Sequence, residues 1–326
     1  MCTPSLSRFS KPLFAAWVIA LTLMSLGSLG ISGVAFAAGA DDEVSVTDAI
    51  VTDHHYQFGI SSSARAMQGS FDAYGNYQPF APGSTAVTYT TILTSSYRLS
   101  QLFEVGMGLP LRRSSETFPT GTMTSWGLNS PSVNVRAHLG GWPHVTVHVS
   151  GSGPWKYSSR TSSGDPGASM PDDLGDGFVS GASLSAGVGV SRTFSPFRVA
   201  MDVTGTHPFA STSTPQDAPA GFTVADVTSQ SGDRLGFSEG LSYLLSKSWT
   251  INAGLRQYWS GPTSVNGLID GTSRGRSFST SLGMSYIPNT DWRINASYET
   301  QYPFYAYAVN LPYAPAVSLG LMYVGI

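Results

Sequence analysis

The sequence predicts an all-β fold: a transmembrane antiparallel up-and-down β-barrel of about 12 strands, with short periplasmic turns and long extracellular loops. Three observations lead to this prediction. Segments of about ten residues alternate apolar and polar side chains, which is the pattern of a strand with two different environments. The connections between these segments alternate in length, as they do in outer-membrane barrels. Charged residues make up only 11% of the chain, against about 25% in soluble domains.

The N-terminus predicts a secretory signal peptide over residues 1–37. Two basic residues and an apolar run up to Leu29 precede Ala35-Phe36-Ala37, an A-x-A cleavage site. A membrane anchor is the alternative, but glycines interrupt the run and no charged stop follows it. We expect cleavage after about Ala37, a short periplasmic leader over residues 38–53 and the barrel over residues 54–326. Cys2, the only cysteine, leaves with the signal, so no disulfide is expected.

The charge balance limits the classes of partner. The chain has 17 basic and 20 acidic residues, and the signal peptide removes two of the basic ones. The mature chain is therefore acidic, which excludes a broad basic surface for nucleic acid. No later segment approaches the roughly 18 consecutive apolar residues of a transmembrane helix.

Twelve segments of the mature chain alternate, and each is near the length that crosses a membrane as a tilted strand. They are residues 55–65, 86–97, 101–111, 128–139, 144–153, 178–191, 197–206, 235–245, 249–259, 277–286, 291–302 and 316–325. The short connections are 98–100, 140–143, 193–196, 246–248 and 288–290. The long ones are 66–85, 112–127, 154–177, 207–234, 260–276 and 303–315, and they offer no packed core of their own. A soluble sandwich has no reason to segregate loop lengths in this way.

The last strand resembles the C-terminal assembly signal of outer-membrane barrels. That signal reads polar, any, glycine, any two, aromatic, any, aromatic. Ser318, Gly320 and Tyr323 fill its first three specified places, whereas the fourth falls on Gly325 and the chain ends in Ile326. The resemblance implies that the barrel-assembly machinery recognises this strand.

The mature chain also resembles a family of outer-membrane transporters associated with phenol degradation. The similar features are GMGLPL at residues 106–111, FPTG at residues 118–121 and the repeated strand–short turn–strand units. The resemblance implies a barrel that passes a small hydrophobic or aromatic solute.

Charges within the strands are expected to face the lumen, because an Arg or Lys facing lipid at mid-depth costs about 2–4 kcal/mol. Glu239 is an exception, since strict alternation places it with apolar Phe237 and Leu241, and only a β-bulge would rotate it inward. The residues predicted to line the lumen and set its selectivity are Arg98, Glu104, Arg136, His138, His148, Arg198, Asp202, Arg256, Arg293 and Glu299.

Several of these charges lie toward the short turns and predict a mixed, mainly basic ring at the periplasmic mouth that biases solute charge. Alternatively, they pair across neighbouring strands and fill the lumen. Eight-stranded barrels are filled by side chains and 16–18-stranded ones hold an aqueous channel, so twelve strands fit a narrow pore.

Aromatic residues beside the short turns and the long loops predict two interfacial belts.

One pair of residues offers an enzymatic alternative. His148 and Ser150 share a strand face and resemble the His-x-Ser pair of some outer-membrane lipid hydrolases. In those enzymes the pair faces lipid, whereas in this strand the valines are expected to face lipid and the pair to face inward. The Gly236–Gly240 segment matches a nucleophile elbow, but it lies inside a strand and no histidine follows it.

Two acidic or histidine-containing segments raise the question of a metal. Asp53-His54-His55 has no second cluster, and the acidic residues of loop 154–177 fit no known calcium spacing. We therefore expect no metal, no cofactor and no enzyme.

The sequence favours an outer-membrane barrel through which a small, hydrophobic or aromatic solute passes passively. The alternatives are a closed structural or adhesive barrel acting through its surface loops, and a lipid hydrolase using His148 and Ser150. The expected partners are outer-membrane lipid, the barrel-assembly machinery and the solute, and nucleic acid is not among them.

Overall fold

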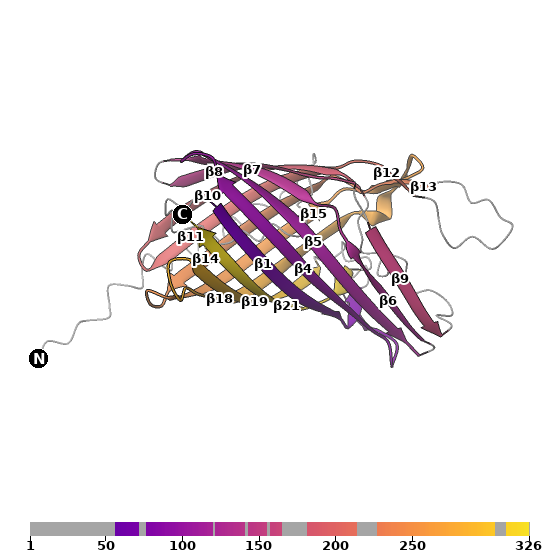
Figure 1. Cartoon of the computed structure of the whole chain (residues 1–326). Coiled ribbons are helices and arrows are strands. Elements are labelled where there is room, and N and C mark those ends of the chain that lie inside the picture. Colours follow the sequence, from indigo (N-terminus) through magenta and orange to yellow (C-terminus); the bar gives the residue numbers. More distant parts are fainter. Residues whose placement is uncertain are drawn as a thin grey trace, which may run out of the picture. The chain divides into compact units, whose positions relative to one another are not determined.

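The computed structural model describes residues 56–71, 76–119, 121–140, 143–154, 157–164, 181–213, 227–303 and 311–325. Twelve of the described strands form one closed antiparallel barrel (Figure 1), which confirms the predicted fold class. They are β1 (Tyr56–Met67), β4 (Thr85–Arg98), β5 (Phe103–Phe118), β7 (Ser132–Leu139), β8 (His144–Ser152), β10 (Ser183–Phe194), β11 (Phe197–Pro208), β14 (Arg234–Leu244), β15 (Trp249–Ser260), β18 (Gly275–Tyr286), β19 (Trp292–Pro303) and β21 (Ala316–Gly325). In the described ranges no helix is long and apolar enough to cross a membrane, a result that does not bear on spanning by strands.

The first and last strands close the barrel. Tyr56 of β1 pairs with Gly325 of β21, and the ladder continues to Arg65 opposite Ala316. On its other side β1 pairs with β4 from Tyr56 to Met67. Closure leaves no open sheet edge in the ring, so the backbone polar groups of the wall satisfy one another in an apolar surrounding.

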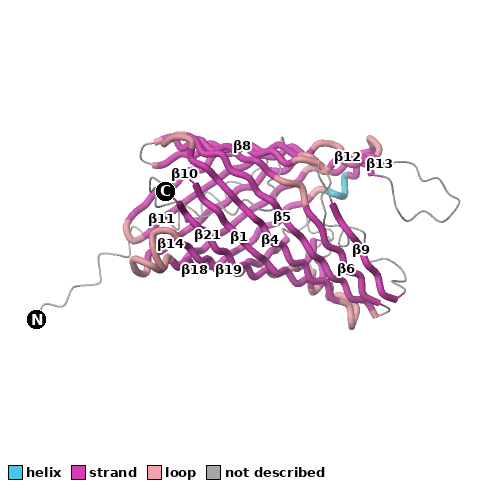
Figure 2. Tube along the Cα trace, in the orientation of Figure 1, coloured by secondary structure: helices cyan, strands magenta, loops and turns pink. Residues whose placement is uncertain are grey.

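Short turns join the barrel strands at one end of the molecule, the short-turn end, where Figure 2 shows compact loops on the left. Those within the described residues are 99–102, 195–196, 245–248 and 287–291. Polar side chains replace ladder hydrogen bonds there. The Asn289 side-chain oxygen accepts from the backbone N–H groups of Asp291 and Trp292, each at 3.0 Å. The predicted segregation of short turns and long loops is confirmed.

The opposite, long-loop end contains more strands than the sequence predicted. The segment 112–127 was expected to be a loop, and this was wrong, because β5 continues to Phe118 and is followed by β6 (Gly121–Leu128). Both β6 and β7 pair with β5, and β9 (Tyr157–Gly164) pairs with β6. Pro131, which cannot donate to a ladder, lies in the break between β6 and β7.

Two small sheets also occur among the long connections. One contains β12 (Ser211–Ser213), β13 (Val227–Gln230), β16 (Thr263–Val265) and β17 (Leu268–Asp270). The other contains β2 (Gly69–Phe71), β3 (Tyr77–Pro79) and β20 (Leu311–Tyr313). Asn266 and Gly267 join β16 to β17 with positive φ angles of 50° and 79°, as a two-residue type I′ hairpin turn requires.

The barrel is inside out relative to a soluble protein. Among the described residues only five hydrophobic side chains are buried, four of them alanines, whereas fifteen polar or charged ones are buried. Large apolar side chains lie on the outer face, as with Val133 and Val135, which are 52% and 44% exposed. Aromatic pairs flank this apolar band near both ends, with Trp249 stacked on Tyr286 at 4.4 Å and Phe278 on Tyr302 at 5.3 Å between ring centroids.

Glu239 lies on the outer face. The ladder of β14 runs without a bulge along both neighbours, and it sets Glu239 opposite Met201 on β11 and Leu255 on β15. The rotation that a bulge would provide is therefore absent, and the carboxyl group shares the lipid-facing surface with apolar side chains.

Candidate functional site

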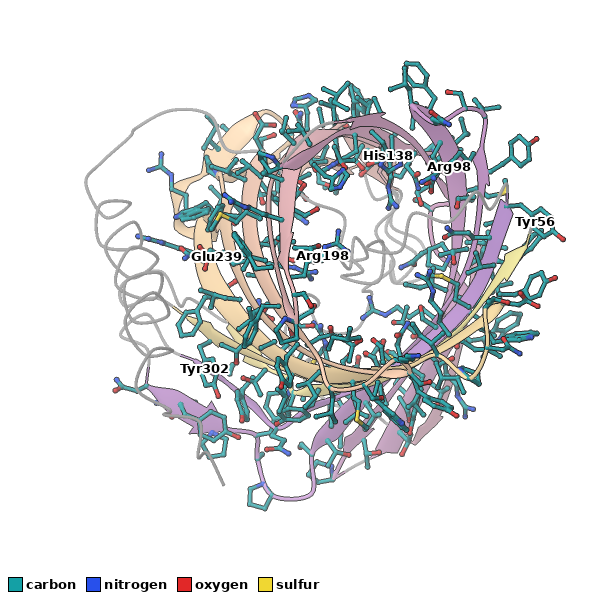
Figure 3. All side chains as sticks on the ribbon, turned by 90° about the vertical axis from the view of Figure 1, so that its left-hand side faces the viewer. Tyr56, Arg98, His138, Arg198, Glu239 and Tyr302 are labelled. Carbon is teal, nitrogen blue, oxygen red and sulfur yellow. The ribbon has the colours of Figure 1, made fainter. Side chains whose placement is uncertain are left out.

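The inner face of the barrel is the candidate site, because it gathers the charged side chains of the strands. All ten candidate residues occupy strand positions on the face that carries the buried serines and threonines. Figure 3 looks along the barrel and shows Arg198 projecting into the lumen, while Tyr56 and Tyr302 project away from it. Their role in selectivity stays a prediction.

The short-turn cluster comprises Arg98, Glu104, Arg136 and His138 on β4, β5 and β7. Glu104 is only 6% exposed. Its carboxylate lies 3.3 Å from His138 Nε2 and 3.9 Å from Arg136 Nη1. Arg98 faces Glu104 directly across the β4–β5 ladder. The Glu104 carboxylate therefore contacts one guanidinium group and one imidazole, and Arg98 adds a second guanidinium group to the cluster, which by count holds more positive than negative charge.

A second group on the inner face joins β8 to β11. His148 Nδ1 lies 3.6 Å from Asp202 Oδ2, and His148 Nε2 lies 3.1 Å from the Thr204 hydroxyl. The same hydroxyl donates a 2.5 Å hydrogen bond to Asp202. Gly187 on β10 leaves room for the imidazole, since a Cβ there would overlap its ring.

The two nitrogens of His148 thus face Thr204 and Asp202. Ser150 lies on the same inner face of β8, away from the apolar outer face that meets lipid. The arrangement therefore adds no support for a lipid hydrolase.

The long-loop cluster comprises Arg65, Arg234, Arg256, Tyr258 and Glu299 on β1, β14, β15 and β19. The Arg256 guanidinium hydrogen-bonds the Tyr258 hydroxyl, and its central carbon lies 5.9 Å from the ring centroid. Charges of Arg65, Arg234 and Glu299 also act on Tyr258. Three guanidinium groups and one carboxylate therefore lie within electrostatic range of one phenol.

The sequence reasoning missed Arg65, Arg112 and Arg234 as lumen residues. It assigned Arg112 and Arg234 to long loops, but both lie on the inner face of described strands. The alternation of β5 continues through Arg112 to the buried Ser114 and Glu116. The sequence carries little signal for this continuation, because the outward residues Arg113 and Ser115 are polar as well.

Among the described strand residues the inner face carries twice as many arginines as carboxylates. The eight arginines are Arg65, Arg98, Arg112, Arg136, Arg198, Arg234, Arg256 and Arg293, and the four carboxylates are Glu104, Glu116, Asp202 and Glu299. Arginines of the outer face lie near the ends of the wall instead, with Arg192 over Phe194 at 4.3 Å and Arg276 over Trp259 at 5.4 Å.

A groove of small, neutral side chains lies along the inner wall of β14, β15, β18 and β19. It includes Ser238, Gly254, Ser281 and Gly283, and it reaches Arg256 and Glu299. The groove therefore connects the middle of the lumen to the long-loop cluster.

The residues of the resembled assembly signal lie on both faces of β21. Ser318 and Gly320 face inward, and Tyr323 faces outward against Trp292 at 5.1 Å and Tyr56 at 6.2 Å. At Gly325, where the signal calls for an aromatic residue, the ring of Tyr56 occupies the space that a side chain would take. Recognition of this strand by the assembly machinery stays a prediction.

The candidate metal segments of the sequence lie outside the described residues. Asp53-His54-His55 precedes β1, and the acidic residues of loop 154–177 fall largely between β9 and β10. Within the described ranges, no group of three or more His, Cys, Asp or Glu side chains has the arrangement of a metal site.

Comparison with known proteins identifies the fold. No model of a known protein family matches the chain, and no curated protein sequence does. Among solved structures, an outer-membrane channel from Pseudomonas putida F1 matches with a TM-score of 0.62 and 11% identity, over 83% of this chain and 96% of the channel. The translocator domain of the autotransporter NalP from Neisseria meningitidis matches with a TM-score of 0.54 and 12% identity, over 97% and 99%. The resemblance to outer-membrane barrels is confirmed at the level of the fold.

Proposed function

We propose that this protein is an outer-membrane channel through which a small solute diffuses passively. The inverted barrel carries the proposal. Its outer face is apolar and its buried residues are mainly polar, which is the distribution that suits lipid outside and a hydrated lumen inside. The predicted signal peptide supports export to the outer membrane, with cleavage after about Ala37.

The solute is small and hydrophobic or aromatic in this proposal. The resemblance to transporters associated with phenol degradation supports this choice, and the solved structure of similar fold from Pseudomonas putida F1 is named as a channel. The polar lumen residues orient and solvate the solute, while the clusters of charge at the two ends filter it.

The test is single-channel conductance of the refolded mature chain in a planar bilayer. Steady discrete current steps are expected, because an open lumen conducts ions. Resistance of the barrel to protease identifies correctly inserted protein. A silent but correctly inserted barrel contradicts the proposal. Entry of a small aromatic solute into proteoliposomes, compared with its entry into protein-free liposomes and with entry of a disaccharide, then tests the solute class.

The barrel-assembly machinery is the proposed partner of β21. Replacement of Tyr323 by alanine is expected to slow assembly by this machinery in proteoliposomes, because it removes the aromatic residue of the resembled signal. Leu319→Ala, an outward substitution on the same strand, is the matched control. Equal assembly rates for the two variants would show that Tyr323 has no recognition role.

A specific observation also favours a role for the surface loops. Leu268 and Ile269 at the β16–β17 hairpin are 77% and 73% exposed, an unusual position for such side chains in water. If the protein is a closed adhesive barrel, L268S/I269S should weaken the attachment of cells to an apolar surface. The wild-type barrel should then carry no current.

A further inference from the structure

The long-loop cluster places more positive charge in the wall than its own carboxylate balances. Arg65, Arg234 and Arg256 come from three different strands, and Glu299 is the acidic member of the cluster. Arg65 and Glu299 both lie across from Ala316, on β1 and β19 respectively. A single carboxylate neutralises one of the three guanidinium groups, so two positive charges remain in excess by count.

Excess like charge in a partly buried wall favours binding of an anion. Guanidinium groups are planar and present donors that match a carboxylate in bidentate fashion. They also keep their charge at any physiological pH. Arg256 is oriented by its hydrogen bond to Tyr258, so part of the arrangement is formed before any ligand arrives.

The adjoining groove offers space for the remainder of such a ligand. Its lining includes the small residues Ser238, Gly254 and Ser281, together with the acidic Glu299 of the cluster itself. The small residues supply hydroxyl groups and close approach to the backbone without filling the lumen. A flat organic group fits against such a surface with its carboxylate directed at the cluster.

We propose that the long-loop cluster is a binding site for the carboxylate of a small organic anion, and that Arg65, Arg234 and Arg256 make the channel anion-selective. The inference rests on the proposed channel function and specifies the charge of its solute. The short-turn cluster should favour anions as well, because its two arginines, Arg98 and Arg136, outnumber its one carboxylate, Glu104. An anion that leaves the long-loop cluster therefore meets a second positive region at the other end of the lumen.

The test uses the full mature channel in a planar bilayer under a KCl gradient. The wild-type reversal potential is expected to show a chloride permeability above that of potassium. R234Q/R256Q is expected to lower this ratio about twofold to sixfold, the range for two charges about 8 Å from the ion path at 0.1 M salt. Arg276→Gln is the matched control, since Arg276 lies at the same end on the outer face and should leave the ratio unchanged.

Glu299→Gln provides a second test, in which the chloride preference should change in the opposite direction. Removal of this carboxylate increases the excess positive charge, so the chloride preference should rise. This variant decides the question if the double arginine variant fails to fold.

Benzoate is the probe for a carboxylate site as distinct from general attraction of anions. It is expected to cause brief interruptions of the wild-type current that disappear in R234Q/R256Q, while benzylammonium causes none. Interruptions that persist in the variant would overturn the site, and a channel that prefers potassium would overturn the selectivity. An inserted barrel without any current would instead overturn the channel function, and this inference with it.

Discussion

Replacement of Glu239 by leucine is expected to stabilise the barrel in a lipid bilayer. Glu239 precedes Leu244, the last residue of β14, by five positions. With a rise of about 3.4 Å per residue and a tilt of about 40°, the carboxyl group lies about 13 Å from the short-turn end of an apolar band about 25 Å tall. The side chain is therefore near the middle of the membrane, between Met201 and Leu255 on the neighbouring strands.

The gain has two contributions. An arginine that faces hydrocarbon at the midplane costs about 2–4 kcal/mol, and a carboxyl group there costs less. Leucine also adds apolar contact with lipid. E239L should therefore raise the free energy of unfolding by about 1–3 kcal/mol. Equilibrium unfolding in urea from phospholipid vesicles, followed by tryptophan fluorescence, measures this difference.

Glu299→Leu is the matched control for Glu239→Leu, since it makes the same chemical change on the inner face. There the carboxylate lies among arginines, so its removal should lower the free energy of unfolding. The reasoning about the two faces is refuted if E239L leaves the barrel no more stable, or if both substitutions shift stability in the same direction.

Two further predictions concern close packing in the wall. Gly187→Ala should lower the free energy of unfolding by about 1–3 kcal/mol, as overpacking does, because the new Cβ overlaps the His148 ring. Gly151→Ala is the control, since the nearest neighbour of its new Cβ would be 3.8 Å away. This variant should leave the free energy of unfolding almost unchanged in the same urea assay. Tyr56→Ala should cost about 1–2 kcal/mol, because its ring covers Gly325 at the β1–β21 seam and packs on Phe58 at 5.7 Å. An unchanged urea midpoint in Y56A would mean that backbone hydrogen bonds alone hold the seam.

Much of the architecture follows from the sequence, because each strand meets two different environments. Lipid outside and water inside impose an alternation of period 2 that is local and readable, as in Val133, Val135 and Arg136. The short turns were equally readable, since residues such as Asn289 make their hydrogen bonds within a few positions. The face of each candidate lumen residue could be assigned from the same local pattern.

Strand lengths beyond the membrane were harder to predict. Outside the apolar band, lipid no longer selects against polar side chains on the outer face, so the alternation of β5 loses its contrast after Leu111. Arg112 therefore looked like part of a loop, as did Arg234 at the start of β14. Pairing with β4 and β6, and not local polarity, keeps this part of β5 extended.

By itself, then, the sequence determined the barrel, its approximate strand number and the side of the wall on which most charges lie, because these depend on the environment of each residue along one strand. Only the tertiary structure decided which charges meet. His148 contacts Asp202, 54 positions away in the sequence, because strand register and closure bring distant segments together. The same register left Glu239 facing lipid without a bulge. It also brought Arg65, Arg234 and Arg256 together from three strands. Hydrogen-bonded pairing across the sheet is a non-local property, and no single strand encodes it.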